Sequence, residues 1–485
     1  MDGSLSRLIK QGGLYALGNT VIKLSGLILA PFYLNPSYLA QAAYGQLILI
    51  EITAQVLILV GGAGLGAGLV KFMTDSSYRP DHDKLPATAL LFSLGLAAAM
   101  AAALGLAATP AARFIFDTPG GAGIIHLAGL YIGLKILAGV PLAFIRIKER
   151  AGLYVLAISM EMVSLILGVY YFLVVAGLGL TGIMYAYILS AAVSSGLVIT
   201  GMLFQVRWSV NPQLLKNLTV FGVPLILAGL ASQLLNAGDR YVLKWFTGAE
   251  VVAVYGWAGK LSSVINMLFV QSFQMAFGVI GLKALNEQDH PGTFFRRVFR
   301  HYIIWTGWAV LGLSLFAYDI TSWISPNREY LAVEGLVFPI ALGYMGYGLY
   351  YIAMNVLYSE MKTRVIAGNM AVACGMNLLL NILLIPYYGA MAAALSTTFS
   401  YGFLLFLTVR KAGRILYIPY PWNAAASVTG ILLGLYLLSL PSVAWEPVYR
   451  LAWRAALLIC FPALMVMLKL YPWTEIRNAI HTFKK

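Results

Sequence analysis

Charged residues are scarce in this chain. Only 10% of its 485 residues are Asp, Glu, Lys or Arg, whereas 60% are hydrophobic. A soluble domain carries about 25% charged and about 45–50% apolar residues. A single globule of this length cannot bury such an apolar excess, and no polar linker divides the chain into smaller domains. We therefore expect lipid to be the surrounding solvent.

Residues for covalent, redox or metal chemistry are also rare. The chain has two cysteines and five histidines. Cys374 and Cys460 each lie inside an apolar run, which argues against a disulfide and predicts small buried thiols. The histidines show no ligand spacing, no nucleophile is paired with a base, and no Gly-rich loop ends in Lys-Ser or Lys-Thr. We expect neither an enzyme nor a bound cofactor, metal or ATP.

Long apolar runs make up most of the chain. A transmembrane helix needs about 20 mainly apolar residues. Fourteen runs qualify, which predicts an all-α polytopic membrane protein of about 14 transmembrane helices. The runs are 12–34, 44–70, 86–108, 121–145, 152–175, 179–204, 217–238, 250–280, 299–318, 332–357, 365–385, 389–409, 422–440 and 448–468.

The basic residues alternate from one connection to the next. Most lie in every second connection and at the two termini, where they include Arg7, Lys71, Arg146, Lys148, Lys283, Arg296, Arg410 and Lys485. The other connections are nearly bare. This positive-inside pattern predicts cytoplasmic termini and an even number of spans. It also accounts for the net charge of +14 without nucleic acid as a partner.

Two short sequence echoes indicate an internal repeat. Tyr44-Gly45 returns as Tyr255-Gly256, and Leu189-Ser190 returns as Leu395-Ser396 at nearly the same offset. A duplicated six-helix unit explains both, and an even helix number gives the copies the same orientation. We expect an N-terminal lobe at 1–210, a C-terminal lobe at 211–415, and two further helices with a cytoplasmic tail at 416–485.

Several charges interrupt the apolar runs. Each costs at least ~2.5–3.5 kcal/mol at the bilayer centre and usually marks a pathway. Lys23, Lys135 and Lys260 lie near mid-span, where we expect them to line an interior cavity of net positive charge, suited to a phosphate or pyrophosphate group. Lys244 and Arg454 lie nearer span ends, where structural ion pairs or snorkelling side chains are expected.

Three carboxylates have two competing interpretations. Glu51, Glu161 and Asp239 either neutralise neighbouring cations or take up a proton or sodium ion that drives a conformational cycle. The sequence leaves both open.

A glycine-rich stretch at 61–68 contains a loose dinucleotide-binding pattern at Gly62, Gly64 and Ala67. It lies within a membrane run, with no strand before it. Close helix packing is the expected role of these small residues.

Local patterns resemble a known transporter group. An opening helix with Lys23 and Pro31 leads to Tyr44-Gly45; 64–72 reads GLGAGLVKF; and 235–243 reads LNAGDRYVL before Tyr255-Gly256. From about residue 5 to 470 the chain resembles the polysaccharide transporter branch of the multidrug/oligosaccharidyl-lipid/polysaccharide superfamily, which includes the Wzx-type O-antigen flippases.

The resemblance implies two six-helix lobes that move undecaprenyl-pyrophosphate-linked oligosaccharides across the bacterial inner membrane by alternating access. It also implies an ion gradient as the drive, membrane lipids around the protein and polysaccharide assembly proteins as further partners. Carried over, the head-group candidates are Lys23, Lys135, Lys260 and Arg240, and the ion-coupling candidates are Glu51, Glu161 and Asp239.

Other function classes fit less well. A multidrug or toxin exporter of the same superfamily would share the fold. Its substrates are mostly cationic, however, and a net-positive cavity disfavours them. A membrane-embedded polymerase or ligase usually needs a long extracytoplasmic loop, and no connection here is long enough. A passive scaffold of an envelope assembly complex would not need buried mid-span lysines.

Overall fold

The computed structural model describes residues 25–75, 82–206, 208–287 and 290–470. All secondary structure in these ranges is helical, and no strand occurs among them. Within the described ranges, twelve helices are long and apolar enough to cross a membrane. This confirms the all-α polytopic fold. The backbone of each helix satisfies its own hydrogen bonds, which lipid cannot do.

The twelve helices account for thirteen of the fourteen expected spans, because the helix Thr363–Ala412 covers both 365–385 and 389–409. The remaining run, 12–34, lies mostly outside the described residues. Large apolar side chains on outward helix faces, such as Leu167 at 62% exposure, have lipid as their expected neighbour.

The chain divides into two compact units. Unit 1 comprises residues up to Lys244 together with Gly248–Ala253, and unit 2 comprises Trp245–Thr247 and the residues from Val254 onward. The elements of unit 1 are α2 (Ala30–Tyr33), α3 (Gln41–Gly61), α4 (Leu65–Thr74), α5 (Leu85–Leu106), α6 (Ala108–Phe116), η2 (Pro119–Gly121), α7 (Ala122–Ile147), α8 (Ala151–Val169), η3 (Tyr170–Val175), α9 (Gly179–Leu203), α10 (Pro212–Ala237) and most of α11 (Asp239–Thr247).

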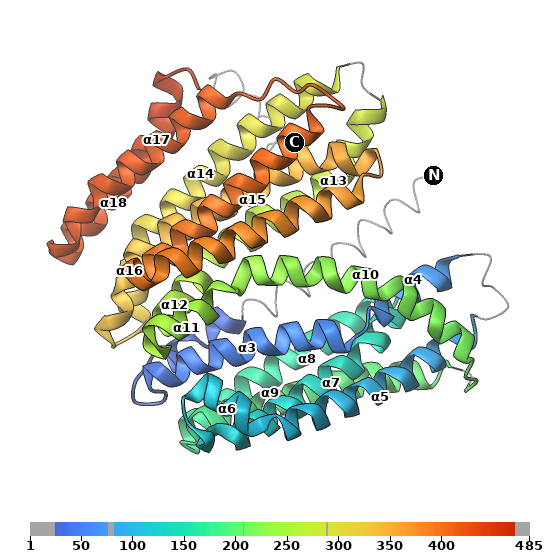
Figure 1. Cartoon of the computed structure of the whole chain (residues 1–485). Helices are drawn as coiled ribbons and strands as arrows, with labels where there is room; N and C mark the ends of the chain where they lie inside the picture. Colours follow the sequence, from blue (N-terminus) through green and yellow to red (C-terminus); the bar gives the residue numbers. More distant parts are fainter. Residues whose placement is uncertain (1–24, 76–81, 207, 288–289, 471–485) are drawn as a thin grey trace. The chain divides into compact units, whose positions relative to one another are not determined.

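Helix α7 forms the centre of unit 1, where it packs against α3, α4, α5 and α9 (Figure 1). Buried Leu69, Phe144 and Leu218 join α4, α7 and α10 in one apolar cluster. The expected lobe boundary at residue 210 lies ahead of α10, whereas α10 packs on α3, α4 and α5 within unit 1. The division into repeated lobes stays a prediction, because it rests on sequence similarity and not on contacts.

A glycine breaks the helix that the sequence predicted as one span at 44–70. Gly64 has φ +64°, a left-handed conformation, between α3 and α4. A Cβ built on Gly64 would lie 2.4 Å from the Cα of Gly222 in α10. The glycine-rich stretch therefore allows close helix approach, as expected from its small residues.

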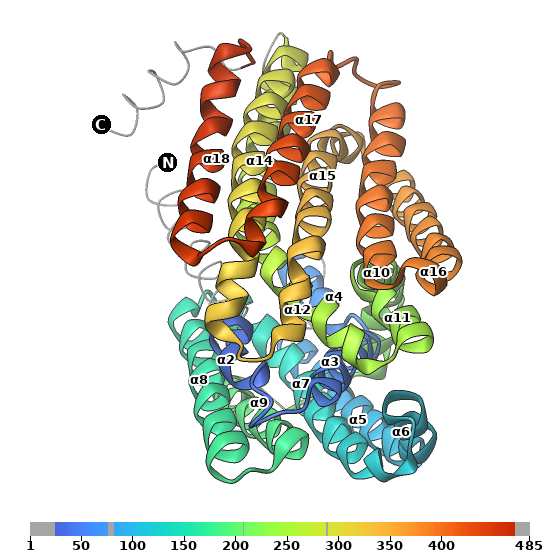
Figure 2. The ribbon, with the colours of Figure 1, turned by 90° about the vertical axis from the view of Figure 1, so that its left-hand side faces the viewer.

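Unit 2 is built around α15. Its elements are α12 (Ala249–Ile265, shared with unit 1 at its start), η4 (Asn266–Gln271), α13 (Ser272–Glu287), α14 (Pro291–Ile324), η5 (Arg328–Ala332), α15 (Val333–Ser359), α16 (Thr363–Ala412), α17 (Trp422–Ser439), η6 (Leu440–Ala444) and α18 (Pro447–Met467). Helix α15 packs against α13, α14 and α16, while α17 and α18 pack on α14 and on each other (Figure 2).

Two details of unit 2 differ from the sequence expectations, and a third agrees with them. The connection expected around 281–298 is mostly helical, because α13 continues to Glu287 and α14 begins at Pro291. The two spans expected at 365–385 and 389–409 are both present in α16, which is kinked at Gly389, whose φ of +54° and ψ of −134° are not helical. The expected burial of both thiols is wrong for Cys460, which is exposed on α18, while Cys374 is partly buried; both are free. An apolar thiol suits a lipid-facing position as well as a core.

Candidate functional site

Charged side chains meet in the middle of unit 1. Lys135, midway along α7, donates to Glu161 of α8, with 2.6 Å between Nζ and Oε1. The lysine side chain is 20% exposed and the glutamate side chain is 7% exposed. Pairing compensates two charges that would each be costly at this depth.

Glu51 lies close to this pair. The Tyr187 hydroxyl, from α9, donates to Glu51 Oε1 of α3 at 2.5 Å. The ring of Tyr131, from α7, lies 5.4 Å from that of Tyr187, centroid to centroid. Four helices therefore contribute charged or hydroxyl groups to one region of unit 1.

A cavity of about 250 Å³ opens between these groups. Glu51 and Glu161 both line it, together with Tyr131, Tyr187 and Ser190. Carboxylate and hydroxyl oxygens are suitable ligands for a proton or a sodium ion. The arrangement can hold a small cation, and Lys135 behind Glu161 supplies a positive charge that an anion can use.

The tyrosines of this cavity are not among the site residues predicted from the sequence. Tyrosine is common near span ends, where it anchors a helix at the membrane interface. Tyr187 and Tyr131 instead lie several residues inside α9 and α7. A mid-span position in an otherwise apolar run is the signal that separates them from anchors.

The Asp239-Arg240 pair lies at the junction of α10 and α11. Asp239 is fully buried, and Arg240 donates from Nη1 to Asp239 Oδ1 at 2.7 Å and to the Asn236 carbonyl at 2.6 Å. The adjacent Tyr241 hydroxyl lies 2.6 Å from Thr53 Oγ1 of α3. The segment Asp239–Tyr241 therefore connects the junction of α10 and α11 to α3.

Two further head-group candidates, Lys23 and Lys260, are not among the described residues that line the cavity of Glu51 and Glu161. Lys23 lies outside the described residues. Lys260 lies half-buried on α12 within unit 2. A cavity shared by the three lysines therefore stays a prediction.

Lys244 and Arg454 form the structural ion pairs expected for them. Lys244, on α11, pairs with Asp117 at the end of α6. Arg454, on α18, is completely buried; its Nη1 donates to Asp319 Oδ2 at 2.8 Å and its Nη2 to Glu334 Oε1 at 2.5 Å.

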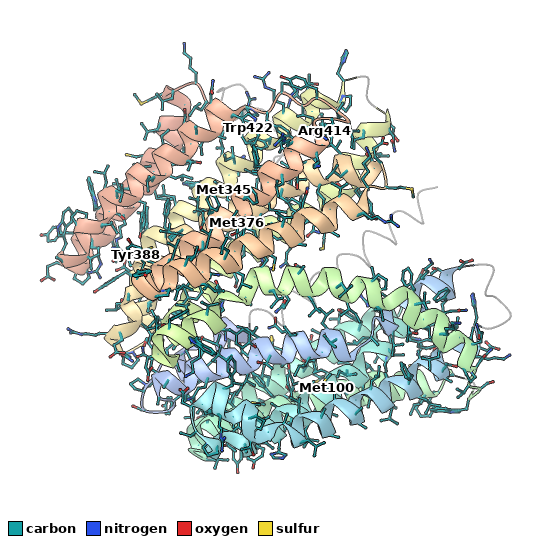
Figure 3. The ribbon with its side chains drawn as sticks, in the orientation of Figure 1. Met100, Met345, Met376, Tyr388, Arg414 and Trp422 are labelled. Atoms are coloured by element: carbon teal, nitrogen blue, oxygen red, sulfur yellow. The ribbon has the colours of Figure 1, made fainter. Side chains whose placement is uncertain are left out.

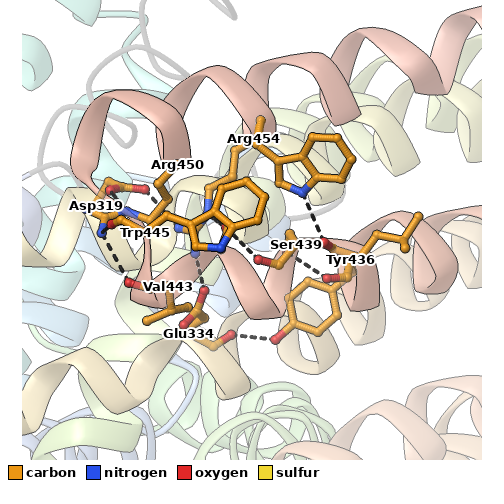
Figure 4. Close-up of polar contacts among 11 residues, drawn as sticks. Asp319, Glu334, Tyr436, Ser439, Val443, Trp445, Arg450 and Arg454 are labelled. Atoms are coloured by element: carbon orange, nitrogen blue, oxygen red, sulfur yellow. Dashed lines mark hydrogen bonds and ion pairs between the residues drawn. The ribbon is translucent and has the colours of Figure 1, made fainter.

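A second arginine completes this group in unit 2 (Figure 4). Arg450 donates from Nε to Asp319 Oδ1 at 2.8 Å, so Asp319 of α14 bridges two arginines of α18. Arg450, Asp319 and Glu334 are not among the charges predicted to matter from the sequence. Asp319 falls in the expected connection 319–331, whereas α14 continues to Ile324. Arg450 and Glu334 lie within the expected runs 448–468 and 332–357, but close to their starts. Two arginines and two carboxylates leave this group with no net charge. This fits a structural link between α14, α15 and α18 and not an ion pathway.

No group of three or more His, Cys, Asp or Glu side chains that could hold a metal ion occurs in the described part of the chain.

Comparisons with solved structures identify the fold. The lipid II flippase MurJ in an inward closed conformation superposes with a TM-score of 0.73, covering 94% of this chain and 100% of that one, at 12% identity. An inward-facing multidrug resistance MATE family transporter of the MOP superfamily gives 0.65 over 86% of this chain and 95% of that one, at 16% identity. A MATE transporter of Vibrio cholerae gives 0.61 over 84% and 97%, also at 16% identity.

Sequence comparisons identify the family. An uncharacterized membrane protein of Methanocaldococcus jannaschii is 25% identical over 209 residues, which are 42% of this chain and 40% of that relative. Residues 8–280, more than half of the chain, match the family described as polysaccharide biosynthesis protein. The chain therefore belongs to the polysaccharide biosynthesis protein family, and it has the polytopic fold that the MurJ and MATE structures share.

Proposed function

We propose that this protein is a flippase, and not an enzyme, that moves undecaprenyl-pyrophosphate-linked oligosaccharide units across a bacterial inner membrane by alternating access. The observation that carries the proposal is the mid-membrane ion pair between Lys135 and Glu161, beside a cavity that Glu51 also lines. A family of polysaccharide biosynthesis proteins and a fold shared with a lipid II flippase support the lipid-linked substrate.

The pair suggests how ion uptake and head-group binding are linked. While Glu161 is ionised, it holds the Lys135 ammonium. A proton or sodium ion on Glu161 neutralises the carboxylate and frees the ammonium for a pyrophosphate oxygen. Lysine binds phosphate as a point charge, so it can also release it. Glu51 and Asp239 remain further ion-coupling candidates, and Lys23, Lys260 and Arg240 further head-group candidates.

Reconstituted protein tests this scheme. Proteoliposomes carrying a fluorescent undecaprenyl-pyrophosphate oligosaccharide are assayed for transbilayer movement, with and without a proton or sodium gradient. We expect Lys135→Ala to slow movement at least about tenfold, the effect of losing roughly 1.4 kcal/mol of head-group binding. We expect Glu161→Gln to keep movement but lose its dependence on the gradient, because its side chain is permanently neutral.

Lys148→Ala is the matched control, since Lys148 is exposed directly after the end of the same helix, α7, whereas Lys135 lies midway along it and pairs with Glu161. Equal rates for Lys135→Ala and Lys148→Ala would remove Lys135 from the head-group site. Retained gradient dependence in Glu161→Gln would remove Glu161 from ion coupling.

A cation-coupled exporter is the second candidate. The lining of the cavity includes two carboxylates and no lysine among the described residues, which suits a cationic substrate better than an anionic one. The same liposomes distinguish the two functions. Gradient-driven efflux of an organic cation that Glu51→Gln abolishes, with no movement of the lipid-linked sugar, would favour the exporter.

The orientation belongs to the same proposal. The positive-inside pattern supports two cytoplasmic termini. A reporter that is active only in the cytoplasm, fused after Lys485, checks the C-terminus; an inactive fusion with an active periplasmic one would reverse the orientation. Polysaccharide assembly proteins are proposed partners and can be tested by co-purification with the full chain.

A further inference from the structure

A second cavity lies in unit 2, where α14 begins, α16 ends and α17 begins. Its volume is about 640 Å³, and it is lined by Arg296 of α14, Val409 of α16, Gly413 and residues 417–424. The positive-inside pattern assigns this end of the helices to the cytoplasm. The expected location is therefore the cytoplasmic membrane interface, far along the helices from mid-span.

Aromatic packing builds the wall of this cavity. The Tyr420 ring lies 5.1 Å from Phe299 and 5.6 Å from Trp422, and Phe299 lies 5.5 Å from Trp422, all between centroids. Ile418 is only 6% exposed. The segment that joins α16 to α17 is therefore packed on α14, and the cavity is part of the fold of unit 2.

The two chain segments that supply the lining of the cavities carry charge of one sign. Residues 291–300 and 402–424 together contain Arg296, Arg297, Arg300, Arg410, Lys411 and Arg414 and no carboxylate. Figure 3 labels Arg414 and Trp422, which lie at the same end of unit 2. Such a cluster attracts the anionic lipids of the cytoplasmic leaflet by about 1 kcal/mol per basic residue.

An apolar cavity of about 400 Å³ adjoins the first. It is lined by Gly402, Leu405, Phe406, Val409 and Arg410, which lie on one face of α16, and by Trp422. Val409 and Trp422 line both cavities. From Val409 to Gly402 the helix rises about 10 Å toward the bilayer centre. The larger cavity, with Arg296 in its lining, therefore continues into an apolar groove that runs along α16 toward the bilayer centre.

We propose that these two cavities bind one anionic glycerophospholipid of the cytoplasmic leaflet. The head-group phosphate lies in the larger cavity against Arg296, and Arg410 and Trp422 lie at the depth of the glycerol backbone, where tryptophan is favoured. One acyl chain follows the α16 face from Val409 to Gly402. A Cβ on Gly402 would meet no atom within 4 Å, which leaves this part of the groove open. The site is separate from the transport cavity of unit 1 and does not depend on the proposed function.

Paired variants separate specific binding from net charge. Arg296→Gln/Arg410→Gln removes two arginines that line the cavities. Arg297→Gln/Arg414→Gln removes two exposed arginines that do not line them: Arg297 is the residue after Arg296, and Arg414 is four residues after Arg410. Both variants carry the same net charge. Binding of dioleoyl phosphatidylglycerol to the purified full chain is measured by native mass spectrometry.

We expect the first variant to weaken phosphatidylglycerol binding roughly 10- to 30-fold and the second by less than about twofold. Wild type should bind dioleoyl phosphatidylethanolamine more weakly than phosphatidylglycerol, because its head group has no net charge. Equal losses in the two variants, or equal affinity for the two lipids, would overturn the proposal.

A groove variant tests the acyl chain separately. Gly402→Leu fills the apolar groove and is favourable for a helix. It should weaken dioleoyl phosphatidylglycerol and leave dihexanoyl phosphatidylglycerol unchanged. No effect on the long-chain lipid would overturn the assigned groove. Undecaprenyl pyrophosphate that binds here, and is lost in Arg296→Gln/Arg410→Gln while phosphatidylglycerol is retained, would reassign the cavity to the transported lipid.

Discussion

Removing Asp319 should destabilise unit 2 more than removal of any exposed carboxylate. Asp319 is 2% exposed and accepts one hydrogen bond from each of Arg450 and Arg454, both at 2.8 Å. Hydrogen bonds to charged groups contribute about 1.5–3 kcal/mol each. Breaking a buried pair by removing one partner costs about 3–5 kcal/mol, because the other charge stays buried. We expect Asp319→Ala to lower the free energy of unfolding by about 3–5 kcal/mol.

The assay is reversible unfolding of the purified chain in mixed micelles, followed by circular dichroism. Glu446→Ala is the control, since Glu446 is exposed directly before α18 and should change stability by less than about 0.5 kcal/mol. Glu334→Gln should fall between the two, because Arg454 keeps its bond to Asp319.

A double variant separates the ion pair from simple loss of packing. Asp319→Ala/Arg450→Met also removes the arginine that loses its carboxylate, since Arg454 keeps its bond to Glu334, and it should be more stable than Asp319→Ala alone. The reasoning is refuted if Asp319→Ala matches Glu446→Ala within about 0.5 kcal/mol. It is also refuted if the second substitution brings no recovery.

Three further predictions follow from named contacts. Gly64→Ala should destabilise the protein by at least about 1 kcal/mol, because Gly64 has a positive φ and lies close to Gly222. Gly95→Ala should not destabilise it, because a Cβ there would meet no atom within 4 Å. Thermal unfolding compares the two variants, and equal midpoints would contradict the argument. Tyr187→Phe removes the donor to Glu51 and should alter the ion dependence of transport in proteoliposomes with folding intact. Tyr185→Phe is the control, because Tyr185 is exposed, and it should match wild type. Identical ion dependence in the two variants would count against a role for the contact between Tyr187 and Glu51. Asn369 donates to Thr408 at 3.2 Å between the two halves of α16. A double-mutant cycle with Asn369→Ala and Thr408→Val should give a coupling free energy of about 0.6 kcal/mol in unfolding. A coupling of zero would be the contrary result.

Much of the fold could be predicted without a structure. The positions of the spans, from the run at 86–108 to the run at 448–468, agree with helices to within a few residues except at two places: α13 continues to Glu287, and α14 is longer at both ends. Run length and hydropathy are local properties, and a membrane helix satisfies its backbone within itself. The extra turns of α14 lie beyond the apolar run, which is why Asp319 was assigned to a loop.

The candidate site could be predicted only in its components. The apolar runs of the sequence identified Lys135, Glu51 and Glu161 as unusual mid-span charges. It could not predict that Lys135 pairs with Glu161, that Glu51 accepts from Tyr187, or that the described cavity lining holds carboxylates and no lysine. The net-positive cavity expected from counting charges depended on all three lysines meeting, which no local pattern can establish.

The sequence by itself determined that the chain is a polytopic helical membrane protein, where its helices run, and which residues would be costly in lipid. Only the tertiary structure decided which of those residues meet: Lys135 with Glu161, 26 residues apart, and Arg454 with Asp319, 135 residues apart. The physical reason is that insertion into a bilayer acts on each span separately, whereas ion pairing acts between helix faces. Those faces are brought together by packing over the whole unit.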